Sequence, residues 1–461
     1  MIRHRPVAPV LLLLLYGCAA GPDYERPELD VPENYVQPVE QGESFANTPW
    51  WELFQDEQLK LLIDTALVEN KDLAIALARI NEARAALGFT RADQFPFING
   101  NGRAARGRGS REINPAADTD NDFLLGGDLS FEVDLWGRLR RSTEAARAEL
   151  LATEEAYRNV TISLVANVAS FYLLLRDLDE RLAISENTLV TRLDSLKIVE
   201  ARFNKGTVPE LDVNQAEIEV AVAEVAVATF ERLIVQTENA LRILLGRNPG
   251  PVTRGQALVD QVFPPEVPAG LPSELIERRP DVLTAEQQLA AQTARIGAAE
   301  ALRFPSLTLT GFLGVESTDL SDLNSGDADL WSVSADVFAP IFNSGKLKSN
   351  VEIERARTEQ LLYNYEATVL QAFREVEDAL VAIRTLKDEY AAQQRRVDAA
   401  RNAARLSQAR YDGGVVDYLE VLDSERTRFS AELDKSATLQ AYLNAIVQLY
   451  KALGGGWPAS P

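Results

Sequence analysis

Cys18 is the residue in this chain best placed for covalent chemistry, because it is the only cysteine among 461 residues and it ends a secretory leader. Arg3 and Arg5 give that leader a basic start, and residues 10–15 form an apolar stretch too short to span a bilayer. A cysteine at this position can carry a thioether-linked lipid once the leader is removed. The alternative is a cysteine with no role in an ordinary leader.

The residues around Cys18 favour the lipid. Leu15-Tyr16-Gly17-Cys18 resembles the lipobox of bacterial lipoproteins, which predicts a signal peptide over residues 1–17 and acyl chains such as palmitate on Cys18. Several acyl chains anchor a protein stably in a membrane. Ala19 and Ala20 follow, so no acidic residue is present there to hold a lipoprotein at the inner membrane.

The composition of the mature chain argues against most other kinds of chemical site. His4 and Met1, the only histidine and the only methionine, lie in the leader. Without Arg3 and Arg5 the basic residues fall from 47 to 45 against 69 acidic ones, a formal charge of −24. The usual general base and the soft metal ligands are therefore missing, and the acidity argues against binding of nucleic acid. We expect no enzyme, no catalytic or metal site and no cofactor, although a site made only of carboxylates could hide among 69 acids.

The sequence of the mature chain contains an internal duplication. Residues 201–213 and 409–421, which read ARFNKGTVPELDV and ARYDGGVVDYLEV, share six of thirteen positions at an offset of 208. Further upstream the offset is 209, where Gly88 pairs with Gly297. A period this long indicates a duplicated half-molecule, since solenoid repeats run to about 20–50 residues.

Four segments alternate apolar and polar residues with a period of two, which is typical of strands. Each is about ten residues or longer, the length at which a tilted strand crosses a bilayer. The predicted strands cover residues 96–108, 123–136, 305–316 and 330–342. Polar loops rich in Asn, Asp, Ser and Gly join the two strands of each pair.

A long helix follows each strand pair. Neither proline nor glycine occurs between Arg138 and Lys205, and apolar residues recur there every three or four positions. A glycine-containing turn then reverses the chain into a second helix. The predicted helices cover residues 142–203, 209–245, 347–411 and 417–453. The predicted divisions are a proline-rich extended tether (18–50), a first repeat (51–246), an equatorial linker (247–279), a second repeat (280–456) and a tail (457–461).

The strands demand more than one copy of the chain. A rod-like coiled-coil protein would explain the helices but not four strands of bilayer length. In lipid every backbone group must be paired, and four strands are too few for a membrane barrel, which needs about eight. Two or three copies would supply eight or twelve strands, and only the larger barrel leaves appreciable room for a lumen.

Two features carry a resemblance to a known family. The first is the duplicated order of strands, long helix and hairpin, and the second is the lipobox followed by Cys18-Ala-Ala-Gly-Pro-Asp-Tyr-Glu-Arg-Pro27. The chain resembles the TolC family of outer-membrane efflux channels, in its lipoprotein (OprM-like, NodT-type) branch. The resemblance implies a mainly α fold with a transmembrane β part. It implies a homotrimer, in which a twelve-stranded barrel with four strands per chain, surrounded by outer-membrane lipid, continues into a periplasmic α-helical barrel.

The resemblance also implies a function and partners. The trimer would be a passive duct for small molecules such as drugs, docked to a periplasmic adaptor protein and to an inner-membrane pump of the RND type. A protein-secretion duct of type I on the same fold is the first alternative. A structural or adhesion lipoprotein without a channel is the second.

Two regions are predicted to carry this function. The hairpin tips, residues 202–211 and 410–419, are expected to contact the adaptor, because valines beside the glycine turns would be exposed on an isolated hairpin. The tip residues singled out are Arg202, Gly206, Thr207, Val208, Arg410, Gly414, Val415 and Val416.

The second region is the periplasmic gate. The segment from Tyr418 to Arg426 resembles the one that narrows the duct in OprM-like channels, which assigns the gate to Leu419, Asp423 and Arg426. Their spacing places them on one helix face. Three copies of Asp423 would repel one another and hold cations, partly balanced by Arg426. The alternative is an ordinary surface pair between Asp423 and Arg426. The first repeat lacks both charges, since it has Leu211, Gln215 and Ile218 there.

Overall fold

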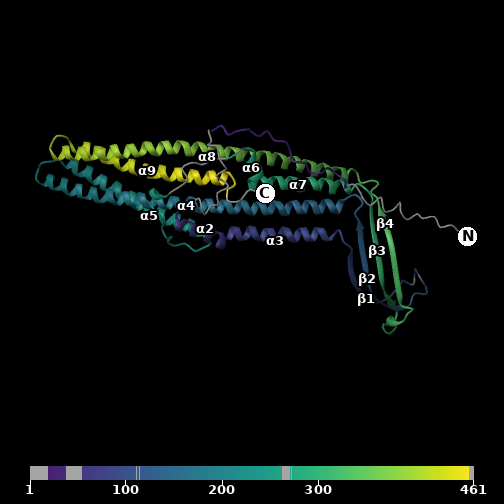
Figure 1. Ribbon diagram of the computed structural model, residues 1–461. Coiled ribbons are helices and arrows are strands. Elements are labelled where there is room, and N and C mark those ends of the chain that lie inside the picture. Colours follow the sequence, from purple (N-terminus) through teal and green to yellow (C-terminus); the bar gives the residue numbers. More distant parts are fainter. Residues whose placement is uncertain are drawn as a thin grey trace. The chain divides into compact units, whose positions relative to one another are not determined.

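The computed structural model describes residues 19–37, 54–110, 112–113, 115–261, 270 and 272–455. The leader, Cys18, part of the tether, part of the equatorial linker and the tail lie outside the described residues. The described elements are two sets of helices and strands that follow each other in the same order (Figure 1). They are α2 (Glu57–Glu69), α3 (Lys71–Ala92), β1 (Phe97–Arg108), β2 (Thr119–Val133), α4 (Arg138–Asn204), α5 (Glu210–Leu244), η2 (Leu258–Asp260), α6 (Pro272–Arg278), α7 (Pro280–Ala301), β3 (Ser306–Ser317), η3 (Leu320–Asn324), β4 (Asp329–Phe338), α8 (Lys346–Asp412) and α9 (Tyr418–Ala452).

The duplication is visible in the element bounds. Helices α4 and α8 both have 67 residues, and α5 and α9 both have 35, with every start and end separated by 208 positions. At about 1.5 Å per residue the two long helices measure about 100 Å. Helices α3 and α7, and strands β1 and β3, repeat at an offset of 209.

The second strand of each pair departs most from its expected range. Strand β2 begins four residues early because Thr119 pairs with Arg108 and extends the ladder into the loop. It ends at Val133, and Gly137, with a φ of 79°, turns the chain into α4 soon afterwards. Strand β4 ends at Phe338 rather than at residue 342, since Pro340 follows and has no N–H for a ladder.

The chain forms two compact units, and each takes segments from both repeats. Unit 1 consists of Met1–Glu28, Arg79–Glu154 and Thr284–Glu366, and it contains the sheet. Unit 2 consists of Leu29–Ala78, Glu155–Leu283 and Ala367–Pro461, and it contains the helical hairpin tips. The two repeats are therefore interleaved in space rather than folded as separate halves.

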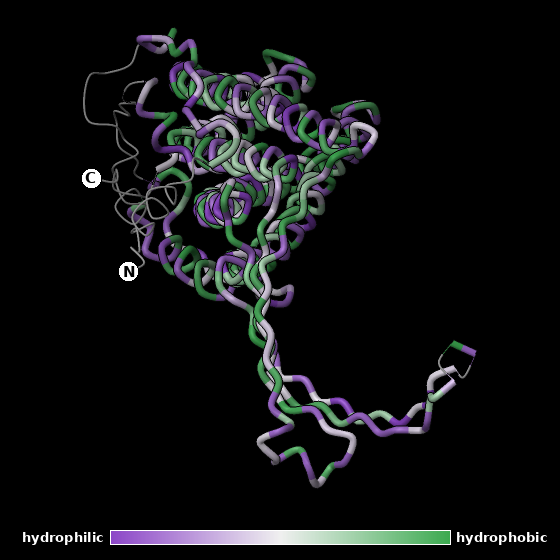
Figure 2. The backbone as a smooth tube through the Cα atoms, turned by 90° about the vertical axis from the view of Figure 1, so that its right-hand side faces the viewer, coloured by the Kyte–Doolittle hydropathy of each residue, from purple (hydrophilic) through white to green (hydrophobic). Residues whose placement is uncertain are grey.

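The sheet in unit 1 is antiparallel, with the order β1-β2-β3-β4. Its pairing register brings Ile98, Leu129, Gly311 and Val333 into one row, so residues two apart from these share a face. That face is apolar over most of the length of all four strands, and Figure 2 shows hydrophobic and hydrophilic residues mixed along the strands. Its apolar members are Ile98, Gly100, Gly102, Ala104, Phe123, Leu125, Gly127, Leu129, Phe131, Val133, Leu307, Leu309, Gly311, Leu313, Val315, Trp331, Val333, Ala335 and Val337. Toward the loops that join β1 to β2 and β3 to β4, the same face becomes polar, with Arg106, Arg108, Thr119, Asn121, Ser317 and Asp329.

The opposite face of the sheet is mostly polar and hydrogen-bonded across strands. Asn99 and Asn101 both donate to the carboxylate of Asp128, and the hydroxyls of Thr310 and Ser334 lie 2.7 Å apart. One face thus suits lipid and the other suits water, which is the arrangement of a membrane barrel wall.

On this polar face, the ring of Phe312 lies against a pair of glycines. Gly126 and Gly314 are opposite each other in the ladder, and an added Cβ at Gly126 would lie 2.5 Å from Cζ of Phe312. An added Cβ at Gly314 would lie 2.9 Å from Cε1 of the same ring. The two glycines therefore provide the space for this ring.

In unit 2, one buried carboxylate joins the start of α2 to α4 and to the linker. Asp56 caps α2 by accepting from the backbone N–H of Gln58 at 2.8 Å and of Leu59 at 3.3 Å. It also accepts from the hydroxyl of Tyr172 in α4 at 2.7 Å. Two further bonds come from the linker, from the Gln256 backbone at 2.9 Å and from the Gln261 amide at 2.8 Å.

These bonds set the ionisation of Asp56. Burial raises its pKa, but the hydrogen bonds from Gln261, Tyr172, Gln256 and Gln58 lower it more, so the pKa lies below its ordinary value. A lowered pKa in the folded state means that the stabilisation is present above the ordinary pKa of about 4 and is lost as the pH falls through the folded value.

We predict that Asp56→Ala lowers the free energy of unfolding of unit 2 by about 3 kcal/mol at neutral pH, because it leaves buried donors unpaired. Glu57→Ala, which removes an exposed side chain one residue away, is the matched control and should change it by less than about 0.5 kcal/mol. Hydrogen exchange of the α2 and linker amides measures both effects. The difference between wild type and Asp56→Ala should shrink below a pH of about 4, and a difference that persists at low pH would contradict the assignment.

Candidate functional site: the hairpin tips and the gate

The first tip is a helix C-cap closed by glycine. After α4 ends at Asn204, the N–H of Gly206 donates to the carbonyl of Phe203 at 2.7 Å, and the N–H of Thr207 donates to that of Arg202 at 3.0 Å. This pair of bonds is a Schellman motif, which needs a left-handed residue. Gly206 supplies it with a φ of 74°. An added Cβ there would meet no atom within 4 Å, so backbone conformation rather than space requires the glycine.

The second tip repeats this geometry. The N–H of Gly414 donates to the carbonyl of Tyr411 at 3.0 Å, and the N–H of Val415 donates to that of Arg410 at 2.9 Å. Gly414 has a φ of 71° and equally open surroundings. The sequence repeat over residues 201–213 and 409–421 thus encodes the same turn twice.

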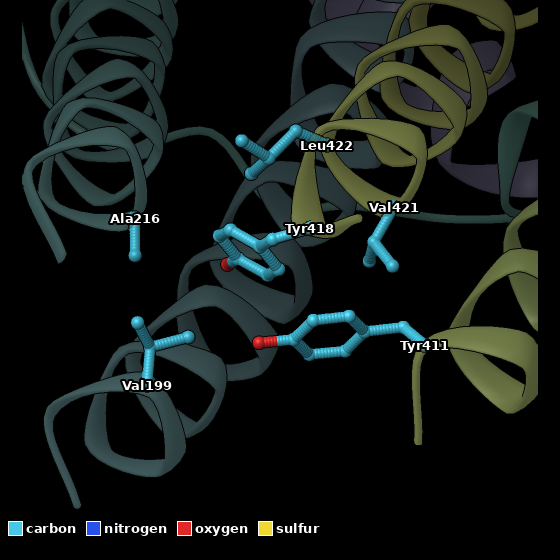
Figure 3. Close-up of a cluster of buried hydrophobic side chains, with 6 residues drawn as sticks. All are labelled: Val199, Ala216, Tyr411, Tyr418, Val421 and Leu422. Atoms are coloured by element: carbon cyan, nitrogen blue, oxygen red, sulfur yellow. The ribbon is translucent and has the colours of Figure 1, made fainter. Parts of the chain in front are cut away.

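The two tips share one apolar cluster in unit 2 (Figure 3), which contains residues from α4, α5, α8 and α9. The buried members are Val199, Ala216, Tyr411, Tyr418, Val421 and Leu422, with Leu196, Val208, Val213 and Val416 packed against them. The rings of Tyr411 and Tyr418 have their centroids 5.2 Å apart. Burial, together with Tyr411 and Glu219, raises the pKa of Tyr418 to about 12.

This cluster corrects one expectation about the tips. Val208 and Val416 were expected to be exposed beside the turns, but both are half-buried against the cluster. Only Val415 remains well exposed, at 68%. The other two valines pack against the apolar cluster that the two hairpins of the chain share.

Arginines tie the tips together. In the first tip, Arg202 contacts the second hairpin, with Nη2 3.2 Å from Oδ1 of Asp412 and its guanidinium carbon 4.7 Å from the centroid of the Tyr411 ring. In the second tip, Nη1 of Arg410 lies 2.7 Å from Oε1 of Glu420. Both arginines singled out from the sequence therefore hold structure within the chain.

The gate residues are separated by the structure into two groups. Leu419 is 58% exposed on α9 and Asp423 is exposed one turn further along. Within the described part of the chain, the carboxylate of Asp423 has neither an ion pair nor a hydrogen bond. Arg426 turns instead to α5, where its Nε lies 2.5 Å from Oε1 of Glu219.

The alternative of an ordinary surface pair between Asp423 and Arg426 is therefore wrong. The expectation that Arg426 partly balances three Asp423 carboxylates around one axis stays a prediction. Glu219 is almost fully buried and offers Arg426 a less hydrated carboxylate than exposed Asp423 does. Among the described residues no side chain pairs with the charge of Asp423, which lies exposed one helical turn from Leu419.

Glu219 holds a second arginine. Nη2 of Arg192 in α4 lies 2.9 Å from Oε2 of Glu219, and its Nη1 donates to the Glu219 carbonyl at 2.7 Å. The two side chains are 7% and 5% exposed, and the guanidinium lies 5.1 Å from the centroid of the Phe429 ring. We call Arg192, Glu219 and Arg426 the tip triad, which links α4, α5 and α9.

The sequence analysis missed the tip triad, although the repeat holds a signal for it. At an offset of 208, Arg192 corresponds to Ala400 and Glu219 to Thr427. Ala400 packs with Val397 and Ala431 in a small apolar cluster. A charged pair in one repeat that is neutral in the other marks a position where the halves differ, but only the structure shows that the charges meet.

The described residues contain no group of three or more histidine, cysteine, aspartate or glutamate side chains placed to hold a metal ion.

We predict that Glu219→Gln destabilises the tip by about 3 kcal/mol, because it leaves the buried Arg192 without a counter-charge. The double variant Arg192→Leu/Glu219→Leu should recover part of that loss, since an apolar pair needs no compensation. Glu217→Gln, on the exposed side of α5, is the control and should have no effect. Hydrogen exchange of α4 and α5 amides near the tip is the measurement. Equal protection in wild type and Glu219→Gln would show that the tip triad is not stabilising.

The chain is similar to known proteins along almost its whole length. A family model described as "Outer membrane efflux protein" matches residues 62–247 and 271–455, one segment in each repeat. The solvent efflux pump outer membrane protein SrpC of Pseudomonas putida is 38% identical over 469 residues, which cover both chains completely. The cation efflux system protein CusC of Escherichia coli is 38% identical, over 96% of this chain and 97% of that protein.

Solved structures show the same fold. A crystal structure of CusC is 36% identical and superposes with a TM-score of 0.87, covering 95% of this chain and all of the other. The open state of the MtrE outer membrane channel of Neisseria gonorrhoeae is 31% identical, with a TM-score of 0.87, covering 95% of this chain and 98% of that one.

Proposed function

Because the chain belongs to the outer membrane efflux protein family, and is thus an outer-membrane exit duct of an efflux system, we propose that three copies form one duct that small molecules cross passively. Unit 1 supplies the membrane wall, and the long helices supply the periplasmic part. The observation that carries this proposal is the sheet, whose one face is apolar over most of its length and whose outer edges, at β1 and β4, have no partner strand among the described residues.

The number of copies follows from the sheet. In lipid the outer edges of β1 and β4 must find partners, because unpaired backbone groups cost several kcal/mol each. Three chains give a barrel of twelve strands, and two chains give a barrel of eight. Side chains would nearly fill the interior of the eight-stranded barrel, whereas the twelve-stranded barrel has a wider interior. The polar face around Asp128 would then line the lumen and the apolar face would meet lipid.

The names of the relatives support a small solute. The relatives are named for solvent, toluene and cation efflux, so small solutes are favoured over the secreted proteins of a type I duct. The family is one of ducts rather than enzymes. The free energy for export would therefore come from an inner-membrane pump, which we propose to be of the RND type.

The tips are proposed to dock a periplasmic adaptor protein. Val415 is the most exposed of the three tip valines, and it stands beside Gly414 at the end of the second hairpin. An exposed apolar residue held on a rigid turn is a suitable anchor for a partner surface. Gly206, Thr207 and Val208 would form the matching part of the first tip.

The gate is proposed at Leu419 and Asp423, with Arg426 holding the α9 segment in place through Glu219. Three uncompensated Asp423 carboxylates around one axis would attract cations and exclude anions. Three Leu419 side chains beside them would narrow the opening. The lipid on Cys18, a residue outside the described part of the chain, is proposed to anchor the trimer to the outer membrane.

The gate is tested by conductance. Leu419→Ala with Asp423→Ala should raise the single-channel conductance in planar bilayers at least about twofold and weaken block by multivalent cations about tenfold, as expected for loss of a strong charge interaction. Leu211→Ala with Gln215→Ala, the equivalent change in the first repeat, is the matched control. Conductance and cation block that both stay at wild-type values would place the constriction elsewhere.

The docking tips are tested by export from cells. Gly414→Leu strains the turn and Val415→Asp places a charge on the proposed contact, so each should reduce export about tenfold while trimers still reach the outer membrane. Gly413→Ala is the control, because an added Cβ there would make only ordinary contacts. Undiminished export by Val415→Asp would refute docking at this tip.

A further inference from the structure

The first described residues of the chain, Ala19–Arg26, are built into unit 1. The N–H of Ala20 donates to the carbonyl of Trp136 at 2.8 Å, between the end of β2 and the start of α4. At Gly137 an added Cβ would lie 2.9 Å from Cα of Ala19. The chain directly after Cys18 therefore packs backbone to backbone against the junction of strand and helix.

A second close approach of backbones follows at Gly21, which crosses Gly297 of α7. Gly21 has a φ of 84°, and a Cβ added to it would lie 2.4 Å from Cα of Gly297 in α7. A Cβ added to Gly297 would lie 2.5 Å from the carbonyl oxygen of Ala20. Only glycine on both sides allows this approach.

Two charged groups fix the segment on either side of the crossing. The buried Arg141 donates to the carbonyls of Ala20 at 3.2 Å and Gly21 at 3.4 Å, and its Nη2 lies 2.6 Å from Oδ1 of Asp23. Its Nη1 also lies 2.8 Å from Oε2 of Glu144, so the guanidinium is fully engaged.

The other group is Glu286 of α7. Its buried carboxylate accepts two bonds from Arg26, at 2.8 and 2.7 Å, and one from the hydroxyl of Tyr24 at 3.2 Å. A two-point bond between a guanidinium and a buried carboxylate is among the strongest polar contacts in proteins. We call residues 19–26 with Gly137, Arg141, Glu286 and Gly297 the N-terminal clamp.

In the part of the chain that the structure describes, the clamp occurs once, although its framework is duplicated. Gly297 corresponds to Gly88, where an added Cβ would meet no atom within 4 Å, and Gly137 corresponds to Gly345, which is equally open. Glu286 corresponds to the exposed Leu77. The clamp is therefore not a by-product of the repeat, because its partners are absent from the equivalent positions.

We propose that the N-terminal clamp is a lipid-independent anchor for the mature N-terminus, and that it fixes the attachment point of the acyl group at the junction of β2 and α4. The second half of this proposal rests on the proposed lipidation of Cys18, the residue before Ala19 in the sequence. The apolar face of the sheet ends at Val133, close to this point.

The surroundings of the junction are those of a membrane interface. The ring of Trp136 stacks on Phe304 with 4.7 Å between centroids, and its indole N–H donates to the carbonyl of Pro305 at 2.8 Å. Tryptophan prefers the level at which hydrocarbon meets water. Acyl chains attached beside Trp136 would enter the bilayer at the depth where the apolar face begins, without a free tether between lipid and sheet.

The anchor is tested by hydrogen exchange on the purified mature protein in lipid nanodiscs. Gly297→Leu should speed exchange of the amides of residues 20–26 at least about tenfold, as for a segment that opens locally. Gly88→Leu, its open equivalent, should leave them unchanged. Arg26→Gln, which alters a half-exposed side chain without crowding α7, should speed exchange in the same segment by a smaller factor. Wild-type protection in both Gly297→Leu and Arg26→Gln would overturn the anchor.

A chain exported behind an ordinary leader and starting at Ala19 separates the anchor from the lipid. Its residues 20–26 should stay as protected as in the lipidated protein, and loss of protection would show that the lipid, not the clamp, holds the segment.

The attachment point is tested with a diazirine-bearing fatty acid fed to the producing cells. Illumination should give adducts on residues 133–136 and 304–305 in wild type, and these should fall at least about fivefold in Gly297→Leu as the segment opens. Adducts that are unchanged in Gly297→Leu would overturn the fixed attachment point. An intact mass without an acyl group would refute lipidation itself, while the exchange experiment would still decide the anchor.

Discussion

The open edges of the four-stranded sheet are the constraint on which the rest of this molecule depends. One chain supplies a wall that is apolar on one face and polar on the other, yet β1 and β4 each leave a row of backbone groups without a partner. Hydrocarbon offers no hydrogen bonds, so such a wall is stable in a membrane only when copies of it close on themselves. Duplication within the chain and assembly of several chains are two ways of meeting the same requirement.

Duplication gives the two halves the same frame but not the same function. The element bounds repeat to the residue in the long helices, and both tips close with the same glycine motif. The charges do not repeat. The tip triad joins Arg192, Glu219 and Arg426, whereas the equivalent Ala400 and Thr427 are neutral. The two repeats give equivalent backbone positions, and substitutions after the duplication made the side chains at those positions different. A pseudo-symmetric wall can therefore carry the proposed gate surface in one repeat only, and one N-terminal clamp per chain.

The buried charges in this protein hold distant segments of the chain in one arrangement, rather than adding to its overall stability. A buried ion pair rarely stabilises more than well-packed apolar side chains would, but it is costly to break. Glu219 between two arginines, Glu286 between Arg26 and Tyr24, and Asp56 under five donors each join segments that are distant in the sequence. Each therefore selects one arrangement of those segments and penalises the alternatives.

The sequence by itself determined whatever is local or periodic. Strand alternation, uninterrupted helices, the glycine turns at residues 206 and 414, and the offset of 208 all follow from short-range sterics and from side-chain period. Those features led to the family and to the membrane duct.

The tertiary structure alone decided which charges meet. It paired Arg426 with Glu219 across 207 positions rather than with Asp423 three positions away, and it left Val208 and Val416 half-buried against the cluster that the two hairpins share. It also brought Gly21 against Gly297. An ion pair or a close backbone crossing depends on distance in space and on local hydration, and neither quantity is contained in the spacing of residues along the chain.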